Sequence, residues 1–309
     1  MEIRLHKKSQ LALKIALTFF LVVYSIYLVI ANPKFLTELE TAGILLFQHR
    51  FSVWIYLVIG LMFVNWGIEG KKWQLLITHV VKIKQLEAFK HVLIGLTMSF
   101  FTPRSLGDYL GRILFLKEEN PWQLTGALAI GRLSQLCITL FFGLLSLLFL
   151  FSKPLISLLF MTLLMISIVA VLFFCRSFIL NTINQFFPKV YQWLKIIKNY
   201  RAKDFLFILV LGGIRYLVFS LQFVIILYLL TEDSSPLHWF PYVSLVFLAK
   251  SIVPSFNFLS DIGVREYSSI FFLGLGGISP EIALTSSLFI WFINILIPTI
   301  LGGAMVWKR

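Results

Sequence analysis

Charged residues are scarce in this sequence, and their scarcity limits the class of protein that it encodes. Asp, Glu, Lys and Arg make up 13% of the 309 residues, 59% are hydrophobic, and the mean hydropathy is +0.90. Soluble globular domains carry about 25% charged residues, so this composition excludes that class. The sequence predicts an all-α polytopic membrane protein that forms a single transmembrane domain over residues 1–309.

Cysteine is almost absent, and the residue types that usually hold metals and nucleotides lack the required spacing. Only Cys137 and Cys175 are present, far apart and within apolar stretches, which excludes a disulfide framework and a thiolate metal site. The five histidines are scattered, and no glycine-rich phosphate-binding loop occurs. We therefore expect no metal, no cofactor and no catalytic constellation.

Long apolar runs are abundant. Six of them approach the roughly 20 residues that a helix needs to cross a hydrocarbon core of about 30 Å. We predict six full transmembrane helices, near residues 12–31, 51–68, 124–151, 154–175, 205–230 and 282–306. The first is interpreted as a retained helix and not a cleaved signal peptide, because its apolar stretch is long and further spans follow.

Two further apolar segments, 91–103 and 242–259, are interrupted by Pro103 and Pro254. Proline lacks a backbone donor and disfavours helix at the preceding residue, so each segment is expected to end inside the protein as a broken or re-entrant hairpin. Gly107 and Gly263 follow the prolines, and we assign them to the hairpin backbones, where glycine permits close approach. Two such elements predict an inverted repeat with halves 1–175 and 176–309.

The basic residues are distributed unevenly along the chain. Most of the 27 Lys and Arg residues lie in loops on the side of the N-terminus, and short cytoplasmic loops carry such an excess. This predicts cytoplasmic N- and C-termini in a plasma (bacterial inner) membrane. The net charge of +13 also suits a nucleic-acid-binding protein, but the basic residues flank spans and form no patch with interleaved aromatics. We expect contact with anionic lipid headgroups and not with nucleic acid.

A second group of charges lies within or beside apolar segments, where ionisable groups are costly and usually functional. In the first hairpin, Arg104, Asp108 and Arg112 recur every four residues, which places Asp108 between two guanidinium groups on one helix face. One positive charge then remains for a phosphate oxygen. The competing interpretation is that both arginines extend to the cytoplasmic interface and Asp108 only neutralises them.

The second hairpin repeats this pattern. Asp261 and Arg265 are four residues apart with Glu266 beside them, and Lys250 lies four residues before Pro254. The alternative here is a structural lock, in which the pairs Asp261–Arg265 and Lys250–Glu266 only hold the hairpin closed.

Three more charged residues border the spans. Arg132 lies about two turns inside its span, deeper than extension to the interface explains, so we place it in the same cavity. Arg215 lies nearer the cytoplasmic boundary, so an interfacial anchor is an alternative to a place in this cavity, and both stay open. We interpret Glu69 as a local ion-pair partner at a membrane boundary. The candidate substrate-binding residues are Arg104, Asp108, Arg112, Arg132, Lys250, Asp261, Arg265 and Glu266.

Three segments together resemble a known family. They are the pattern Pro-x-x-x-Gly-Asp-x-x-x-Arg from Pro103 to Arg112, the sequence Asp-Ile-Gly-Val-Arg-Glu from Asp261 to Glu266, and the basic segment after Asn65-Trp66. This combination resembles the lysylphosphatidylglycerol synthase transmembrane-region family, also described as flippase-like, over nearly the whole chain. Ser260-Asp261 stand where that family commonly has Gly-Gly, and Asp108 stands where Glu is common.

The resemblance implies a membrane protein that moves lipid across the bilayer. Some family members are fused to an aminoacyl-transferase that makes lysyl-phosphatidylglycerol. This chain has no room for that domain, so we expect a stand-alone membrane member without synthase activity.

The leading prediction is a lipid translocator that binds the phosphate headgroup of an anionic phospholipid or polyprenyl-phosphate lipid in a polar intramembrane cavity. Arg104, Arg112, Arg132 and Arg265 would neutralise the phosphate. One alternative is a membrane-embedded enzyme that acts on a lipid phosphate with Asp108 or Glu266 as general base. Another is a non-catalytic membrane partner of a lipid-modifying or glycosyl-transferring enzyme.

Overall fold

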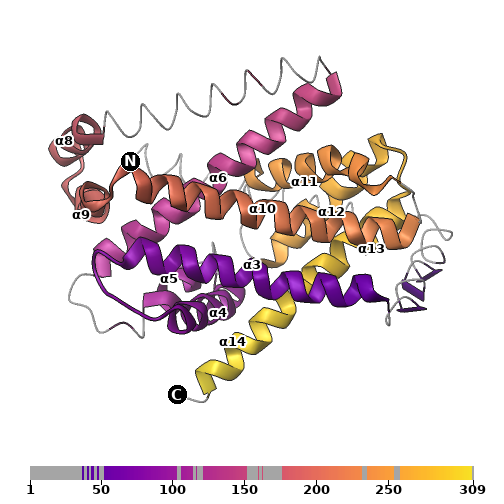
Figure 1. Cartoon of the computed structure of the whole chain (residues 1–309), viewed down its shortest axis with the longest axis horizontal. Coiled ribbons are helices and arrows are strands. Elements are labelled where there is room, and N and C mark those ends of the chain that lie inside the picture. Colours follow the sequence, from indigo (N-terminus) through magenta and orange to yellow (C-terminus); the bar gives the residue numbers. More distant parts are fainter. Residues whose placement is uncertain are drawn as a thin grey trace, which may run out of the picture.

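The computed structural model describes residues 52–102, 106–113, 121–151, 176–231, 235–253 and 258–307, with isolated positions at 116, 159, 162 and within 37–48. Every regular element in this described part is helical (Figure 1). The all-α prediction is therefore confirmed for these residues.

Four helices in the described part are long and apolar enough to cross a membrane. They are α3 (Val53–Ile77), α6 (Pro121–Phe151), α10 (Ala202–Thr231) and the continuous run of α13 (Pro280–Trp291), η5 (Phe292–Leu296) and α14 (Ile297–Trp307). They confirm the predicted spans near 51–68, 124–151, 205–230 and 282–306, so the chain is a polytopic membrane protein. The predicted spans near 12–31 and 154–175 lie almost wholly outside the described residues.

The helices α3 and α10 lie antiparallel at the centre of the bundle (Figure 1). Near the start of α3, the ring of Trp54 lies 5.5 Å from that of Tyr228 near the end of α10. One turn further along α3, the Val58 carbonyl accepts a hydrogen bond from Gln222 Nε2 at 2.8 Å. Later positions of α3 thus contact earlier positions of α10, so the C-terminal ends of the two helices lie at opposite ends of the bundle.

The first hairpin consists of α4 (Gln85–Phe101) and α5 (Leu106–Ile113), which pack together through glycines. A β-carbon at Gly107 would lie 2.1 Å from the Met98 carbonyl oxygen, and one at Gly111 would lie 2.6 Å from Gly95 Cα. The Thr102 hydroxyl accepts a hydrogen bond from the Gly107 N–H at 2.6 Å and thereby closes the tip. The helix break falls at the predicted place, although Pro103 itself lies outside the described residues.

The second hairpin consists of α11 (Phe240–Ile252) and α12 (Phe258–Leu275), preceded by the short helix η4 (Pro236–Trp239). It packs on α6, where a β-carbon at Gly143 would lie 2.6 Å from Leu248 Cβ. Because α4 follows the end of α3 and α11 follows the end of α10, the two hairpins enter the bundle from opposite ends (Figure 1). Pro254 lies outside the described residues.

The last span contains a wide turn at η5, and Pro298 accounts for it. Proline has no N–H to donate, so the Asn294 carbonyl four residues earlier lacks its usual helical partner. The Ile297 N–H bonds instead to Phe292, five residues back. The Asn294 carbonyl accepts from the indole Nε1 of Trp66 on α3 at 2.9 Å, which fixes the last span against the first described one.

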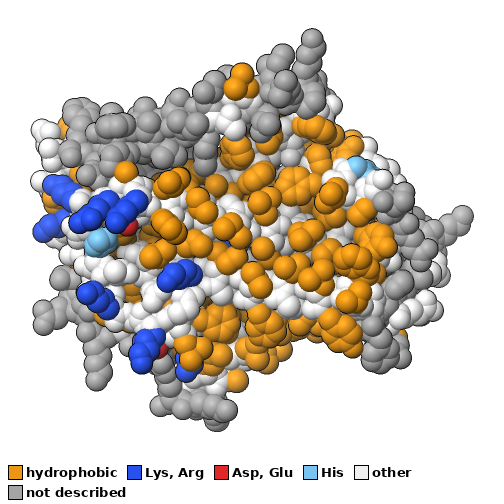
Figure 2. Space-filling model, in the orientation of Figure 1, with side chains coloured by type: hydrophobic (Ala, Val, Ile, Leu, Met, Phe, Trp, Pro, Cys, Tyr) orange, Lys and Arg blue, Asp and Glu red, His pale blue; other side chains and the backbone are white. Residues whose placement is uncertain are grey.

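Basic side chains gather at one end of the bundle and hydrophobic side chains cover its middle (Figure 2). That end holds the close of α3, the start of α10, and the short helices α8 (Arg176–Phe186), α9 (Pro188–Leu194) and η3 (Lys195–Asn199). Its exposed basic residues include Lys71, Lys82, Lys84, Lys195, Lys198, Arg201 and Lys203. This separation of charge from apolar surface is typical of a protein whose middle faces lipid.

Candidate functional site

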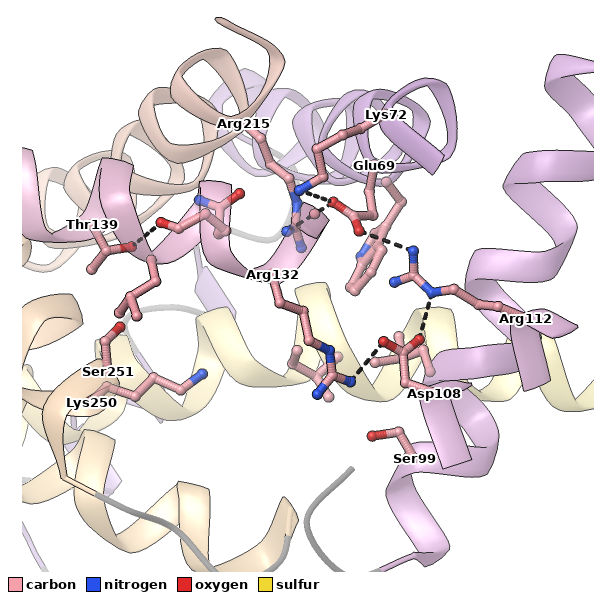
Figure 3. A pocket seen from close by; sticks show the side chains of 16 residues that line it. Glu69, Lys72, Ser99, Asp108, Arg112, Arg132, Thr139, Arg215, Lys250 and Ser251 are labelled. Carbon is pink, nitrogen blue, oxygen red and sulfur yellow. Dashed lines mark hydrogen bonds and ion pairs between the residues drawn. The ribbon is translucent and has the colours of Figure 1, made fainter. Parts of the chain in front are cut away.

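A cavity of about 520 Å³ lies among α3, the first hairpin, α6, α10 and the end of α11 (Figure 3). Much of its lining is ionisable, although the surrounding helices are apolar. The charged lining residues are Glu69, Lys72, Asp108, Arg112, Arg132, Arg215 and Lys250. Charges in such a setting are stable only when they are paired or serve a ligand.

Glu69 on α3 binds three cationic side chains from three helices. Its Oε2 lies 2.8 Å from Lys72 Nζ on the same helix and 3.2 Å from Arg215 Nη1 on α10. Its Oε1 accepts from Arg112 Nη1 of the first hairpin at 3.0 Å. Glu69 is 6% exposed and Lys72 is 2% exposed, so this carboxylate is an almost fully buried centre that joins the hairpin to both central helices.

Asp108 is the second carboxylate of the cavity, and arginines occupy both of its oxygens. Its Oδ1 accepts from Arg112 Nε at 2.6 Å, one helical turn along α5. Its Oδ2 accepts from Arg132 Nη2 of α6 at 2.8 Å. Arg112 therefore bridges Asp108 and Glu69. Gly95 makes room for this arrangement, because a β-carbon there would lie 2.6 Å from Asp108 Oδ1.

The guanidinium group of each of the three arginines lies over an aromatic ring. The guanidinium carbons of Arg112, Arg132 and Arg215 lie 5.6, 4.6 and 5.1 Å from the ring centroids of Trp73, Tyr109 and Trp66, respectively. A cation over an aromatic face is attracted by the negative charge of that face. These rings hold the guanidinium planes in place while leaving their edges for hydrogen bonds.

An amide pair extends the network to the last span. Arg215 Nε donates to Asn65 Oδ1 at 3.1 Å, and Asn65 Nδ2 donates to Asn294 Oδ1 at 3.3 Å. Both asparagines are buried, and Asn294 lies in the wide turn of η5. The position of Arg215 therefore depends on the turn that Pro298 imposes.

Cations outnumber carboxylates in this network. Lys72, Arg112 and Arg215 share Glu69, while Arg112 and Arg132 share Asp108. The side chains of Arg132 and Arg215 are 40% and 22% exposed, against 6% for Arg112, and they point into the cavity (Figure 3). A cavity with such a surplus of guanidinium groups is suited to bind an anion.

Four of the predicted site residues line this cavity: Asp108, Arg112, Arg132 and Lys250. Arg104 lies outside the described residues, and the side chain of Asp261 is also outside them. No group of three His, Cys, Asp or Glu side chains suited to a metal ion occurs in the described part.

Arg265 and Glu266 lie elsewhere, packed between α12 and α13. They are 1% and 3% exposed, and neither lines the cavity. Arg265 Nη2 pairs with Glu266 Oε1, and Arg265 Nε donates to Ser287 Oγ at 2.9 Å. The Ser287 hydroxyl also donates to Glu266 Oε1 at 3.1 Å. The structure thus pairs Arg265 with its neighbour Glu266, whereas Lys250 lines the cavity. Gly263 is buried in α12.

Three residues that line the cavity are not among the candidates predicted from sequence: Glu69, Lys72 and Arg215. The local ion pair expected for Glu69 is present with Lys72, but the carboxylate also binds two arginines. The predicted span ended at residue 68, but α3 continues to Ile77, so Glu69 and Lys72 lie within the helix, and both are buried. Their spacing of three residues within an apolar helix was an available signal. The position of Arg215 beside Glu69 follows from the antiparallel packing of α3 and α10, which no local pattern reveals.

Comparison with known proteins identifies one relationship. A family model described as the lysylphosphatidylglycerol synthase TM region matches residues 11–302. The match covers nearly all of the 309 residues and includes every element of the cavity. No curated protein and no solved structure gives a significant match.

Proposed function

Since this chain belongs to the lysylphosphatidylglycerol synthase transmembrane-region family, we propose that it is a flippase-like lipid translocator. Its cavity would bind the phosphate headgroup of an anionic phospholipid or polyprenyl-phosphate lipid. The observation that carries this proposal is the charge of the cavity, in which Lys72, Arg112, Arg132 and Arg215 surround only Glu69 and Asp108.

Neutralisation is the physical requirement for moving a phosphate through hydrocarbon. Even one side-chain charge at the bilayer centre costs about 2.5–3.5 kcal/mol on insertion scales. Arginine stays charged and binds phosphate oxygens through two parallel N–H groups, so the exposed Arg132 and Arg215 suit this task. A cavity of about 520 Å³ has the size of a small-ligand site and would hold a headgroup while the acyl chains stay in the bilayer.

The arrangement of the two halves supports transport. The two halves can be aligned by one constant shift in residue number. The shift that aligns Asp108 with Asp261 also aligns Arg112 with Arg265 and places α3 within α10. The same shift places α4 on η4 and α11, and places α6 along α13 to α14. Because α3 and α10 are antiparallel, the repeat is inverted, and transporters with inverted repeats bind substrate between their broken helices.

These relations extend the proposal to the membrane topology. The halves would be residues 1–175 and 176–309, with six full spans and two re-entrant hairpins. Both termini would lie on the cytoplasmic side of a plasma membrane, where the basic end of the bundle would contact anionic headgroups.

The enzymatic alternative has less support from the site. Both oxygens of Asp108 already accept hydrogen bonds from arginines, so this carboxylate is engaged in ion pairs within the protein and is not presented to a substrate as a general base. Glu266 lies outside the cavity lining. A scaffold that only docks a lipid-modifying enzyme would not need the buried cations at all.

Lipid binding and translocation test the proposal. The purified chain would be titrated with phosphatidylglycerol, or with zwitterionic phosphatidylcholine, and bound lipid counted by native mass spectrometry. Fluorescent phosphatidylglycerol in proteoliposomes, quenched from outside, would report translocation. We expect the double variant Arg112→Ala/Arg132→Ala to bind phosphatidylglycerol at least about 10-fold more weakly, because charge-assisted hydrogen bonds are lost.

The matched control is Lys195→Ala/Lys203→Ala, which removes the same charge from exposed positions at the basic end. It should bind and translocate like the wild type. Equal binding and translocation by both double variants would overturn the proposal and favour the scaffold.

A further inference from the structure

The second hairpin is a counterpart of the first with fewer charges. The residue shift that carries Asp108 and Arg112 onto Asp261 and Arg265 carries Glu69 onto Gln222. It also carries Lys72 onto Ile225 and Arg132 onto Thr285. The second half therefore keeps the aspartate and the arginine of the hairpin, but neutral residues stand where Glu69, Lys72 and Arg132 stand in the first half.

In this structure the counterpart is closed. Arg265 is 1% exposed, and its guanidinium is held by Glu266 and by Ser287 of α13. Arg112, in contrast, lines a cavity and joins two carboxylates on different helices. The two arginines at equivalent positions are thus in different states, one facing a cavity and one enclosed.

The helices α12 and α13, which hold Arg265 between them, carry hydrogen-bonding groups that the closed arrangement does not use. Glu266 Oε2, Thr285 Oγ1 and Ser286 Oγ are buried and have no hydrogen-bond partner in the described structure. The three residues are 3%, 8% and 0% exposed. Buried polar groups are nearly always satisfied, so these unpaired groups, carried by the two helices that hold Arg265, suit a second arrangement in which they have partners.

We infer that Arg265 is the centre of a second anion-binding site that is closed here and opens when the first site closes. This inference rests on the proposed translocation. In inverted repeats, each half can adopt the arrangement that the other half shows, which gives access from the opposite side. If the second hairpin takes the arrangement of the first, Arg265 faces a cavity as Arg112 does here, and the same phosphate-bearing headgroup replaces Glu266 as its partner.

The second site is the weaker one. Arg265 is the cation of α12, whereas the equivalents of Lys72 and Arg132 are uncharged. Glu266 also competes with the phosphate for Arg265. Glu266→Gln removes the competing charge, keeps the shape of the side chain, and should strengthen anion binding at this site.

The experiment isolates the second site by disabling the first. Phosphatidylglycerol would be titrated by native mass spectrometry into the full chain with Arg112→Ala/Arg132→Ala as background. In this background, we expect weak residual binding, a rise of at least about 10-fold with Glu266→Gln, and loss of binding with Arg265→Ala. Glu281→Gln is the matched control. It neutralises a different buried carboxylate, which lies on α13, and should leave binding unchanged.

Folding is checked separately, because Arg265 is buried. Arg265→Lys keeps the charge and loses the two-pronged geometry, so it should fold and bind with intermediate strength. Size-exclusion profiles and melting temperatures of all variants would be compared with those of the background.

The outcomes separate the two proposals. If Glu266→Gln and Arg265→Lys both leave residual binding unchanged, the second site is overturned, while wild-type binding that depends on Arg112 keeps the translocator proposal. If wild-type binding does not depend on Arg112, the translocator proposal fails. If lipid binding then depended on Arg265 but not on Arg112, Arg265 would form a binding site without the proposed transport. That result would overturn the inference that the second site opens when the first closes.

Discussion

The two hairpins have the same Asp-x-x-x-Arg spacing but use their arginines differently. In the first, Arg112 reaches Glu69 on α3, and Arg132 of α6 reaches Asp108, so charges are shared across helices and line a cavity. In the second, Arg265 pairs with its neighbour Glu266 and is enclosed by α13. The comparison teaches that partners on other helices, and not the motif, decide whether such an arginine is available to a ligand.

Packing differs between the hairpins as well. In the first, the backbones of α4 and α5 touch at Gly95 and Gly111, and a β-carbon at Gly302 of α14 would lie 2.2 Å from the Leu93 carbonyl oxygen. In the second, Gly274 has open space around it. An added side chain therefore has no room at these glycines of the first hairpin, but it has room at Gly274 near the end of α12.

The largest effect is expected from a side chain placed between α4 and α5. Gly107→Val puts a β-carbon 2.1 Å from the Met98 carbonyl oxygen, and a backbone atom cannot move aside cheaply. We expect a loss of about 3 kcal/mol or more in stability, and poor recovery of monodisperse protein on size exclusion. Gly274→Ala in the second hairpin, where nothing lies within 4 Å, should be recovered like the wild type. Similar recovery of both variants would contradict the difference in packing.

The next effect concerns the carboxylates. Glu69→Ala leaves Lys72, Arg112 and Arg215 without their shared counter-ion, which should cost about 3–5 kcal/mol and lower the melting temperature in detergent. Glu266→Ala should cost less, because it strands one arginine that still donates to Ser287.

A compensating variant sharpens this comparison. Lys72→Met in the Glu69→Ala background removes one buried stranded charge and should recover part of the melting temperature. Equal losses for Glu69→Ala and Glu266→Ala would show that both carboxylates serve as local ion-pair partners only.

A smaller effect on stability, with a distinct effect on binding, is expected at Arg132. Its side chain is 40% exposed, so Arg132→Lys should change stability by at most about 1 kcal/mol. Lysine keeps the charge but loses the two-pronged geometry, so phosphatidylglycerol binding should weaken several-fold, less than with Arg132→Ala. The measurement is lipid titration by native mass spectrometry. Equal binding by the Lys and Ala variants would show that the positive charge at position 132 is not what the lipid recognises.

The smallest effect is expected in the amide pair that positions Arg215. Asn65→Ala and Asn294→Ala should each cost about 1 kcal/mol of stability, because each removes one link of the same chain of hydrogen bonds. The double variant should cost less than the sum of the two, by about 0.5 kcal/mol or more, in thermal unfolding. Additive losses would mean that the pair does not act as one unit.

Much of the candidate site followed from local patterns. The four-residue spacing of Asp108 and Arg112 correctly indicated an ion pair on one face of a helix, and the depth of Arg132 indicated a cavity. Glu69 and Arg215 were not among the predicted cavity residues, because a residue at the end of an apolar run has no local signal that tells a membrane boundary from the middle of a longer helix. Arg265 was placed with the cavity because its motif matches that of Arg112.

The sequence by itself determined the class of the protein, four of its described spans, the position of the hairpin breaks and the Asp108–Arg112 pair. Each of these depends on contacts within a few turns of one helix or on the cost of placing charge in hydrocarbon. Only the tertiary structure decided that α3, α6 and α10 bring Glu69, Arg132 and Arg215 to the first hairpin, while the second is enclosed. The physical reason is that a buried charge takes the partner that packing brings nearest, and helix packing is set by surfaces far apart in the chain.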